Sequence, residues 1–168
     1  MDCTIRPWRR SDKTALAAII NNKNILDNLR DGIPYPYSEK DAEEYITAML
    51  SADQTKTFPF AITVGDELIG SISVFRCDNI HCRTAEVGYY IAEPHWGQGH
   101  CTSAVKQICA YIFEHTDIIR IFADPFAYNT GSCRVLEKAG FQYEGTLRSN
   151  AYKNGKVLDM KMYALVKE

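Results

Sequence analysis

The spacing of apolar residues changes from helical to strand-like near residue 58, and this change constrains the fold more than any other feature. Apolar residues in 39–50 recur every three or four positions, as on one face of a helix. From Phe58 to Val64 every second residue is large and apolar, which is the spacing of a strand. Two more strands, 68–75 and 84–91, follow across short turns. The sequence therefore predicts a three-strand antiparallel meander after a helical region.

The segments on either side of the meander alternate between strand and helix. The expected strands are 3–7, 118–123, 141–149 and 157–166; the expected helices are one that ends near Asn22, then 39–50, 102–115 and 129–139, with 24–37 mostly loop. Ser11 or Asp12 can cap the first helix, 38–41 resembles a capping box, and Gly140 ends the last helix. The order β-α-α-β-β-β-α-β-α-β-β predicts an α+β fold with a mixed, mostly antiparallel, twisted sheet of about seven strands and helices on both faces.

Length and charge narrow the class of protein. The 168 residues suit one domain, which we expect to span 1–168. Lys and Arg number 19 against 21 Asp and Glu, and the resulting charge of −2 favours neither nucleic acid nor an anionic membrane as a partner. No apolar run is long enough to cross a bilayer, and the first residues lack the apolar stretch of a signal peptide. The sequence thus predicts a cytoplasmic protein.

The six cysteines are expected to be reduced thiols in such a compartment. They are Cys3, Cys77, Cys82, Cys101, Cys109 and Cys133. The segment 77–82, with a cysteine at each end, could be half of a metal site, but no second ligand pair with zinc-like spacing follows it. We therefore expect no metal.

Two stretches carry the chemistry. In the first, the strand 85–91 leads into Trp96-Gly97-Gln98-Gly99-His100-Cys101-Thr102, a loop that opens a helix. The free N–H groups and partial positive charge of such a helix N-terminus favour a phosphate, although two glycines there are also typical of a plain tight turn. The second stretch, 129–141, is an amphipathic helix with Asn129 as its N-cap.

Together these stretches resemble the GNAT acetyltransferases, and the resemblance extends over essentially the whole chain. The loop matches the family's acetyl-CoA loop, with Trp96 in place of Arg or Gln and Cys101 in place of a small residue. Further matches are Asn129, Ser132, Leu136, Glu137, Lys138, Gly140 and Phe141, then Glu144, Gly145, Arg148, Asn154, Gly155, Asp159 and Tyr163, and the early segment 34–38. Within the family the chain is similar to the Rim-type group, which acetylates N-termini of ribosomal proteins.

The resemblance implies acetyl-CoA as the cofactor, with its pantetheine arm along strand 86–91. That strand should splay from its neighbour so that its backbone groups are free to pair with the arm. The residues implied to bind the cofactor are Tyr89, Tyr90, Ile91, Trp96, Gly97, Gln98, Gly99, His100, Cys101, Thr102, Asn129, Ser132 and Lys138. A backbone N–H near Tyr89 or Tyr90 is the implied oxyanion donor.

The implied catalytic residues are Glu86 as the base and Ser132 as the acid that protonates the leaving sulfur. Both also have plain structural interpretations, as a salt-bridged glutamate and a small residue beside the cofactor. Many family members place an acid Tyr where this chain has Leu136, and some Rim-type enzymes place a Glu where it has Ala151. These two departures leave a non-catalytic CoA-binding module open as an alternative.

The acceptor is expected to be a primary amine, and the α-amine of a protein or peptide N-terminus is favoured. An α-amine titrates near pH ~8 and a lysine near ~10.4, so the α-amine makes the smaller demand on a base. The residues expected to select the acceptor are Leu29, Ile33, Tyr35, Tyr37, Arg148 and Tyr152. Small amines such as a polyamine, an amino acid or an antibiotic are the alternative, and both a monomer and a homodimer stay open.

Cys101 lies at the start of the expected helix that follows the loop. A helix N-terminus lowers the pKa of a thiol, so we expect a reactive Cys101 whose modification blocks cofactor binding.

Overall fold

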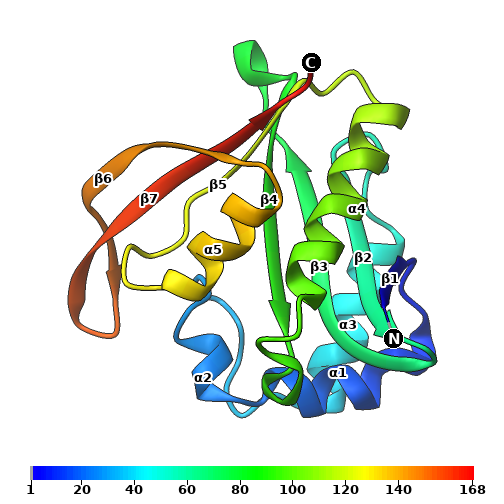
Figure 1. Cartoon of the computed structure of the whole chain (residues 1–168). Helices are drawn as coiled ribbons and strands as arrows, with labels where there is room; N and C mark the ends of the chain where they lie inside the picture. Colours follow the sequence, from blue (N-terminus) through cyan, green and yellow to red (C-terminus); the bar gives the residue numbers. More distant parts are fainter. Residues whose placement is uncertain (1) are drawn as a thin grey trace.

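The chain forms one seven-stranded sheet, described here from a computed structural model for residues 2–168. The strands lie in the order β1 (Cys3–Arg6), β2 (Thr57–Val64), β3 (Glu67–Arg76), β4 (Thr84–Ile91), β5 (Arg120–Ala123), β7 (Lys156–Val166) and β6 (Gln142–Lys153) (Figure 1). Every neighbouring pair is antiparallel except β4 and β5, which are parallel. The predicted α+β fold with a mixed, mostly antiparallel sheet is confirmed.

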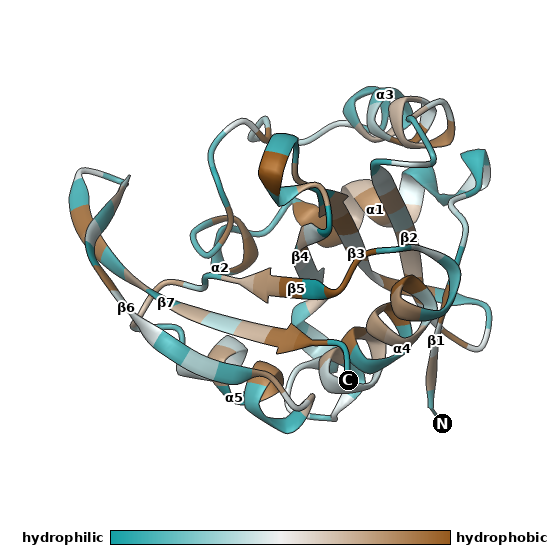
Figure 2. Cartoon of the chain, turned by 90° about the horizontal axis from the view of Figure 1, so that it is seen from above, coloured by the Kyte–Doolittle hydropathy of each residue, from teal (hydrophilic) through white to brown (hydrophobic). Residues whose placement is uncertain are grey.

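Helices cover both faces of the sheet, as predicted. They are α1 (Lys13–Ile20), α2 (Lys23–Leu26), α3 (Glu39–Leu50), α4 (His100–His115) and α5 (Thr130–Lys138). Seen from above, α1, α2 and α3 lie on one side of the sheet and α4 and α5 on the other (Figure 2). Short 3-10 turns occupy Arg10–Asp12, Asn79–His81 and Glu93–His95. The helix α2 is a correction, because 24–37 was expected to be mostly loop.

Each face of the sheet has its own hydrophobic core, because alternate strand residues point to opposite faces. The core under α4 and α5 is built around Val74, Val87, Ile108, Ile121 and Leu136. The core under α1 and α3 is built around Trp8, Leu16, Ile46, Ala61 and Leu68. The strand β4 contributes to both, since Val87 belongs to the first core and Tyr90 packs against the second.

The capping predictions have different outcomes. Ser38 and Asp41 form the predicted capping box at the start of α3, and the Asn129 side chain accepts a hydrogen bond from the Ser132 N–H at the start of α5. Asp12 stands at the N-cap of α1 but makes no side-chain cap bond there. Its carboxylate instead accepts two hydrogen bonds from the Arg6 guanidinium, at 2.8 and 2.7 Å.

The parallel strands β4 and β5 separate after only three paired positions, and this separation creates the site. Their pairing runs from Thr84 opposite Arg120 to Glu86 opposite Phe122. Beyond Glu86 the edge of β4 that faces β5 is open as far as Ile91. The predicted splay is therefore confirmed. On the far side of β5, the β6–β7 hairpin curves away from the rest of the sheet (Figure 1).

Candidate active site

A large cavity surrounds the open edge of β4. Its volume is about 1070 Å³, and residues from both faces of β4 line it. On the α4 and α5 face lie the loop before α4, the start of α4, and α5, including Asn129, Ser132 and Lys138. On the other face lie 28–34, parts of α3, and the outward residues of β3 and β4. We call these parts the cofactor half and the acceptor half; they meet along β4.

Backbone geometry shapes the cofactor half. Gly97 and Gly99 have φ angles of 73° and 83°, values that a residue with a Cβ rarely adopts. Gly99 is the N-cap of α4 and has no side chain to satisfy the first-turn N–H groups, which stay free for an anion. The Trp96 indole Nε1 donates to the Ile91 carbonyl oxygen at 2.8 Å and ties the loop to the end of β4.

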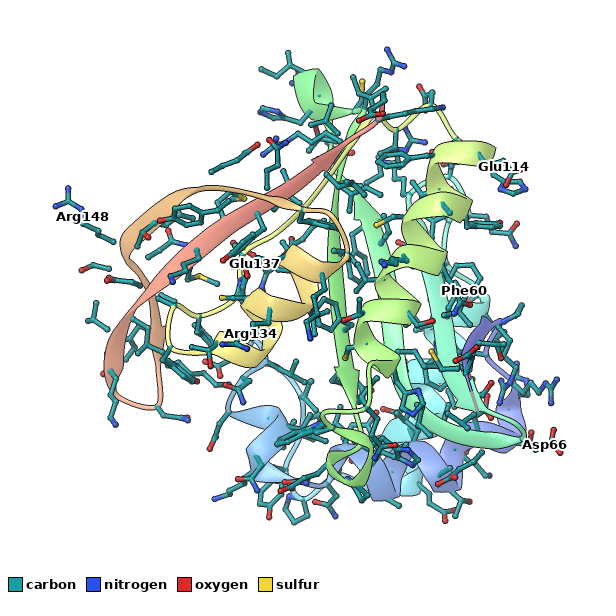
Figure 3. The ribbon with its side chains drawn as sticks, viewed as in Figure 1. Phe60, Asp66, Glu114, Arg134, Glu137 and Arg148 are labelled. Carbon is teal, nitrogen blue, oxygen red and sulfur yellow. The ribbon has the colours of Figure 1, made fainter. Side chains whose placement is uncertain are left out.

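Basic side chains lie beside that helix N-terminus. Lys138 and Arg134 of α5 line the cofactor half, and Figure 3 shows Arg134 extending from α5. A smaller hollow of about 420 Å³ adjoins it and shares Gly99, Thr102 and Lys138, with Lys106 on its wall. Positive backbone charge and two or three cations together suit a group with several phosphates.

The expected low pKa of the Cys101 thiol is wrong. Its side chain packs against the core beneath α4, and burial raises the pKa of the thiol to about 12 instead of lowering it. At this position the loss of hydration destabilises the thiolate by more than the helix N-terminus stabilises it. All six cysteines are free thiols in the structure.

Ser132 and Tyr89 form a hydroxyl pair at the floor of the cofactor half. The Tyr89 Oη lies 2.8 Å from the Ser132 Oγ. Burial raises the pKa of Tyr89 well above its ordinary value, so the phenol keeps its proton. Leu136, where many relatives carry a tyrosine, is completely buried in the core, and the Tyr89 hydroxyl reaches Ser132 from β4 instead. The sequence offered no signal for this contact, which joins residues 43 positions apart.

Glu86 lies in the acceptor half at the point where β4 and β5 separate. Its carboxylate pairs with the Arg30 guanidinium, whose Nη2 also lies 3.2 Å from the Asp124 Oδ1. Burial raises the pKa of Glu86; Arg30 acts in the opposite direction and Asp124 in the same direction. Arg30 and Asp124 were not predicted as site residues, although Asp124 directly follows the expected strand 118–123.

Most of the predicted site residues line the cavity. Of the residues expected to bind the cofactor, these are Tyr89, Tyr90, Ile91, Trp96, Gly97, Gly99, His100, Cys101, Thr102, Asn129, Ser132 and Lys138, although the Tyr90 side chain lies on the acceptor face; the others are Glu86, Leu29, Ile33 and Tyr37 in the acceptor half. Gln98, Tyr35, Arg148 and Tyr152 lie outside it.

The four outlying residues have other surroundings. The Gln98 amide donates to the Pro94 carbonyl oxygen, and the Lys23 ammonium lies 5.1 Å from the centre of the Tyr35 ring. Tyr152 is 71% exposed, and Arg148 points away from the molecule at the outer edge of the β6–β7 hairpin (Figure 3). The hairpin curves away from the rest of the sheet and carries Arg148 on its outer edge (Figure 3). Next to Tyr152, the tip of the hairpin contacts the loop after α2, where Lys153 pairs with Asp31 and Asn154 donates to Asp27.

Neither a metal site nor a membrane segment is found in the part of the chain that the structure describes. Within 2–168, no three His, Cys, Asp or Glu side chains are grouped so that they could hold a metal ion. Within the same residues, no helix combines the length and apolar character needed to span a bilayer.

Comparison with known proteins decides the family. The model of the acetyltransferase (GNAT) domain matches residues 2–142. The chain belongs to the GNAT acetyltransferase family. Acetyl-CoA is the cofactor that this family uses, and the free N–H groups, the open strand edge and the basic side chains of the cofactor half fit it.

Several relatives of this GNAT enzyme carry names. The probable N-acetyltransferase YjcK of Bacillus subtilis is 37% identical over 117 residues, which cover 70% of this chain and 65% of that protein's own length. The ribosomal-protein-serine acetyltransferase of Escherichia coli is 28% identical over 149 residues, 88% of this chain and 83% of that protein. The crystal structure of spermidine N-acetyltransferase from Vibrio cholerae, with CoA and spermine, superposes with a TM-score of 0.82 at 25% identity over 99% of this chain and 96% of that one.

Proposed function

We propose that this enzyme transfers an acetyl group from acetyl-CoA to the α-amine of a protein or peptide N-terminus by direct attack of the amine on the thioester. The observation that carries the proposal is the cavity divided by the open edge of β4, with Ser132 on one face and Glu86 on the other. Such an arrangement lets the two substrates meet at one strand without an acetylated enzyme as an intermediate. Holding two reactants in position is itself a large part of such catalysis.

Strand geometry favours Tyr89 over Tyr90 as the oxyanion donor. The Ala92 N–H donates to the Ile69 carbonyl oxygen on β3. Because the N–H groups of a strand alternate between its two edges, the Tyr90 N–H also faces β3, and the Tyr89 N–H faces the open edge. Of the two predicted donors, Tyr89 is therefore the one available to stabilise a developing oxyanion.

The proton transfers can be assigned to Glu86 and Ser132. Glu86 takes a proton from the ammonium, and the neutral nitrogen then forms its bond to the thioester carbonyl carbon as the carbon–sulfur bond breaks. Ser132 gives a proton to the departing sulfur and regains one from the nitrogen, which loses its second proton as the amide forms. Tyr89, which stays protonated, orients the Ser132 hydroxyl. One ammonium and acetyl-CoA thus become one amide, CoA thiol and one released proton.

The preference for an α-amine follows from the small number of groups that can deprotonate the acceptor. Glu86 is the one base assigned in this mechanism, and an α-amine with a pKa near ~8 is partly neutral at pH 7, whereas a lysine near ~10.4 is not. The relative in Escherichia coli is named for acetylation of a ribosomal-protein serine, which supports the same acceptor class. The acidic acceptor half and the similarity to a spermidine acetyltransferase favour a polyamine as the second candidate.

Release of CoA thiol from acetyl-CoA tests the proposal. The acceptors are short peptides with free N-termini and, in parallel, polyamines and aminoglycosides; peptides with blocked N-termini are the matched control. Saturable turnover with the free peptides that is absent with the blocked ones is expected. Turnover with small amines alone would keep the cofactor and the chemistry but overturn the acceptor class.

A further inference from the structure

We propose that Glu86 and Asp124 together bind the ammonium group of the acceptor, and that Arg30 occupies this position until the acceptor displaces it. The inference rests on the proposed function, since it concerns the amine that this enzyme acetylates. It adds Asp124 as a positioning residue and Arg30 as a residue that sets acceptor affinity.

The two carboxylates come from β4 and from the end of β5 and line the same cavity. Glu86 is opposite Phe122, the last paired position, and Asp124 lies two residues beyond Phe122, just after β5. The Asp124 carboxylate contacts the same Arg30 nitrogen as Glu86, and Gly88 lies two residues beyond Glu86 on the open part of β4. Gly88 has no side chain, and nothing lies within 4 Å of the place that a Cβ would take. The carboxylates therefore border open space at the point where the strands separate.

A cation of this chain already occupies the position. A single nitrogen, Arg30 Nη2, pairs with both Glu86 Oε1 and Asp124 Oδ1. A primary ammonium offers the same positive charge and several N–H donors from one nitrogen. The arrangement of Arg30 thus shows what kind of group the two carboxylates accept.

In this ion-pair cluster the two carboxylates are held in place by the sheet, whereas Arg30 can be replaced by another cation. The Glu86 and Asp124 side chains are 23% and 16% exposed and belong to, or directly follow, strands of the sheet. The Arg30 side chain is 66% exposed and extends from the loop after α2. An ion pair with such an exposed partner is weak, so an acceptor that enters the cavity can replace it.

The acceptor half is mainly acidic and the cofactor half is basic, which matches a cationic acceptor and an anionic cofactor. The acceptor half is lined by Asp31, Asp41, Glu44, Glu86 and Asp124 with Arg30 among them, and Lys153 pairs with Asp31 at 2.8 Å, whereas Arg134 and Lys138 line the cofactor half. Displacement of Arg30 leaves Glu86 and Asp124 free to attract a cationic acceptor.

Direct binding tests the inference without any need for turnover. Calorimetric titration of 1,4-diaminobutane into the CoA-saturated enzyme would compare wild type with Arg30→Ala and Asp124→Asn. We expect binding about fivefold tighter in Arg30→Ala and about tenfold weaker in Asp124→Asn. The matched control is Arg120→Ala, which breaks an exposed pair with Glu144 outside the cavity and should leave the affinity unchanged.

Two more measurements complete the test. Guanidinium chloride should compete with the diamine in Arg30→Ala more strongly than an equal concentration of sodium chloride, and Arg30→Lys should restore wild-type affinity. Equal affinity in wild type, Arg30→Ala and Asp124→Asn would overturn the inference even if acetyl transfer proceeds. The expected binding pattern with no turnover of any amine would uphold it while the proposed function fails.

Discussion

The cofactor half and the acceptor half of the cavity share one strand but are built by different means. The cofactor half consists largely of backbone: glycines with positive φ, a helix N-terminus and an open strand edge. The acceptor half consists of charged side chains from separate segments, with Arg30 from a loop, Glu86 from β4 and Asp124 from the end of β5. Backbone groups do not depend on side-chain identity, so a side-chain substitution should change the acceptor half more than the cofactor half.

The largest expected effect on activity comes from Glu86→Gln, which removes the proposed general base from the acceptor half. We expect kcat/KM for the acceptor to fall by about 100-fold or more, since general base catalysis contributes that much. Burial raises the pKa of Glu86, so wild-type activity should rise as pH increases through that pKa, and the variant should lose this rise. The measurement is a pH series of initial rates.

Acetyl-CoA affinity is the control for this variant. It should be unchanged in Glu86→Gln, because the side chain belongs to the acceptor half. Full activity in the variant would show that another group or a water molecule takes the proton.

The hydroxyl pair gives the next largest effect. Ser132→Ala and Tyr89→Phe should each lower kcat by about tenfold, and the double variant should be little worse than either, because residues in one hydrogen-bonded unit are not additive. Single-turnover rates with saturating acetyl-CoA measure this coupling. Effects that multiply in the double variant would mean that the two hydroxyls act independently.

A smaller effect is expected for Gly99→Ala in the cofactor half. A φ of 83° costs an L-residue about 1 kcal/mol, so the loop of the free variant should relax to another conformation. Acetyl-CoA must then restore the binding conformation and should bind roughly fivefold more weakly, while acceptor KM stays the same. Gly155→Ala is the matched control, since its φ is 75° at the tip of the β6–β7 hairpin, outside the cavity. Equal losses of acetyl-CoA affinity in both variants would contradict a local role for Gly99.

Alkylating reagents should have the smallest effect, because Cys101 should react slowly. Burial raises the pKa of the Cys101 thiol to about 12, so almost none of it is the reactive thiolate at pH 8. Iodoacetamide should therefore modify exposed Cys82 first and leave Cys101 and acetyl-CoA binding intact. Mass spectrometry of peptides after a timed reaction checks the order, and rapid alkylation of Cys101 would show that the helix N-terminus dominates after all.

The sequence predicts the cofactor half more completely than the acceptor half, because the first depends on local features and the second on long-range contacts. The loop at 96–102 and the helix caps are local features, in which the residue type and the backbone conformation that it permits lie together in the chain. The Arg30–Glu86–Asp124 cluster joins residues as far as 94 positions apart, and its formation depends on the point at which β4 and β5 separate.

Two other predictions also depended on long-range structure. Arg148 and Tyr152 were expected near the acceptor but do not line the cavity, and Arg148 lies on the outer edge of the curved β6–β7 hairpin, whose path is a property of the folded sheet (Figure 3). The pKa of Cys101 depends on how completely the core covers its thiol, which no local pattern reveals.

Initial rates with both substrates varied test the central claim most directly, namely that cofactor and acceptor occupy opposite faces of β4 at the same time. The account predicts double-reciprocal lines that intersect, because both halves must be filled before transfer. It also predicts that mass spectrometry finds no acetylated enzyme when acetyl-CoA is present alone. Parallel lines together with a stably acetylated side chain would contradict direct attack and would assign the transfer to two separate steps.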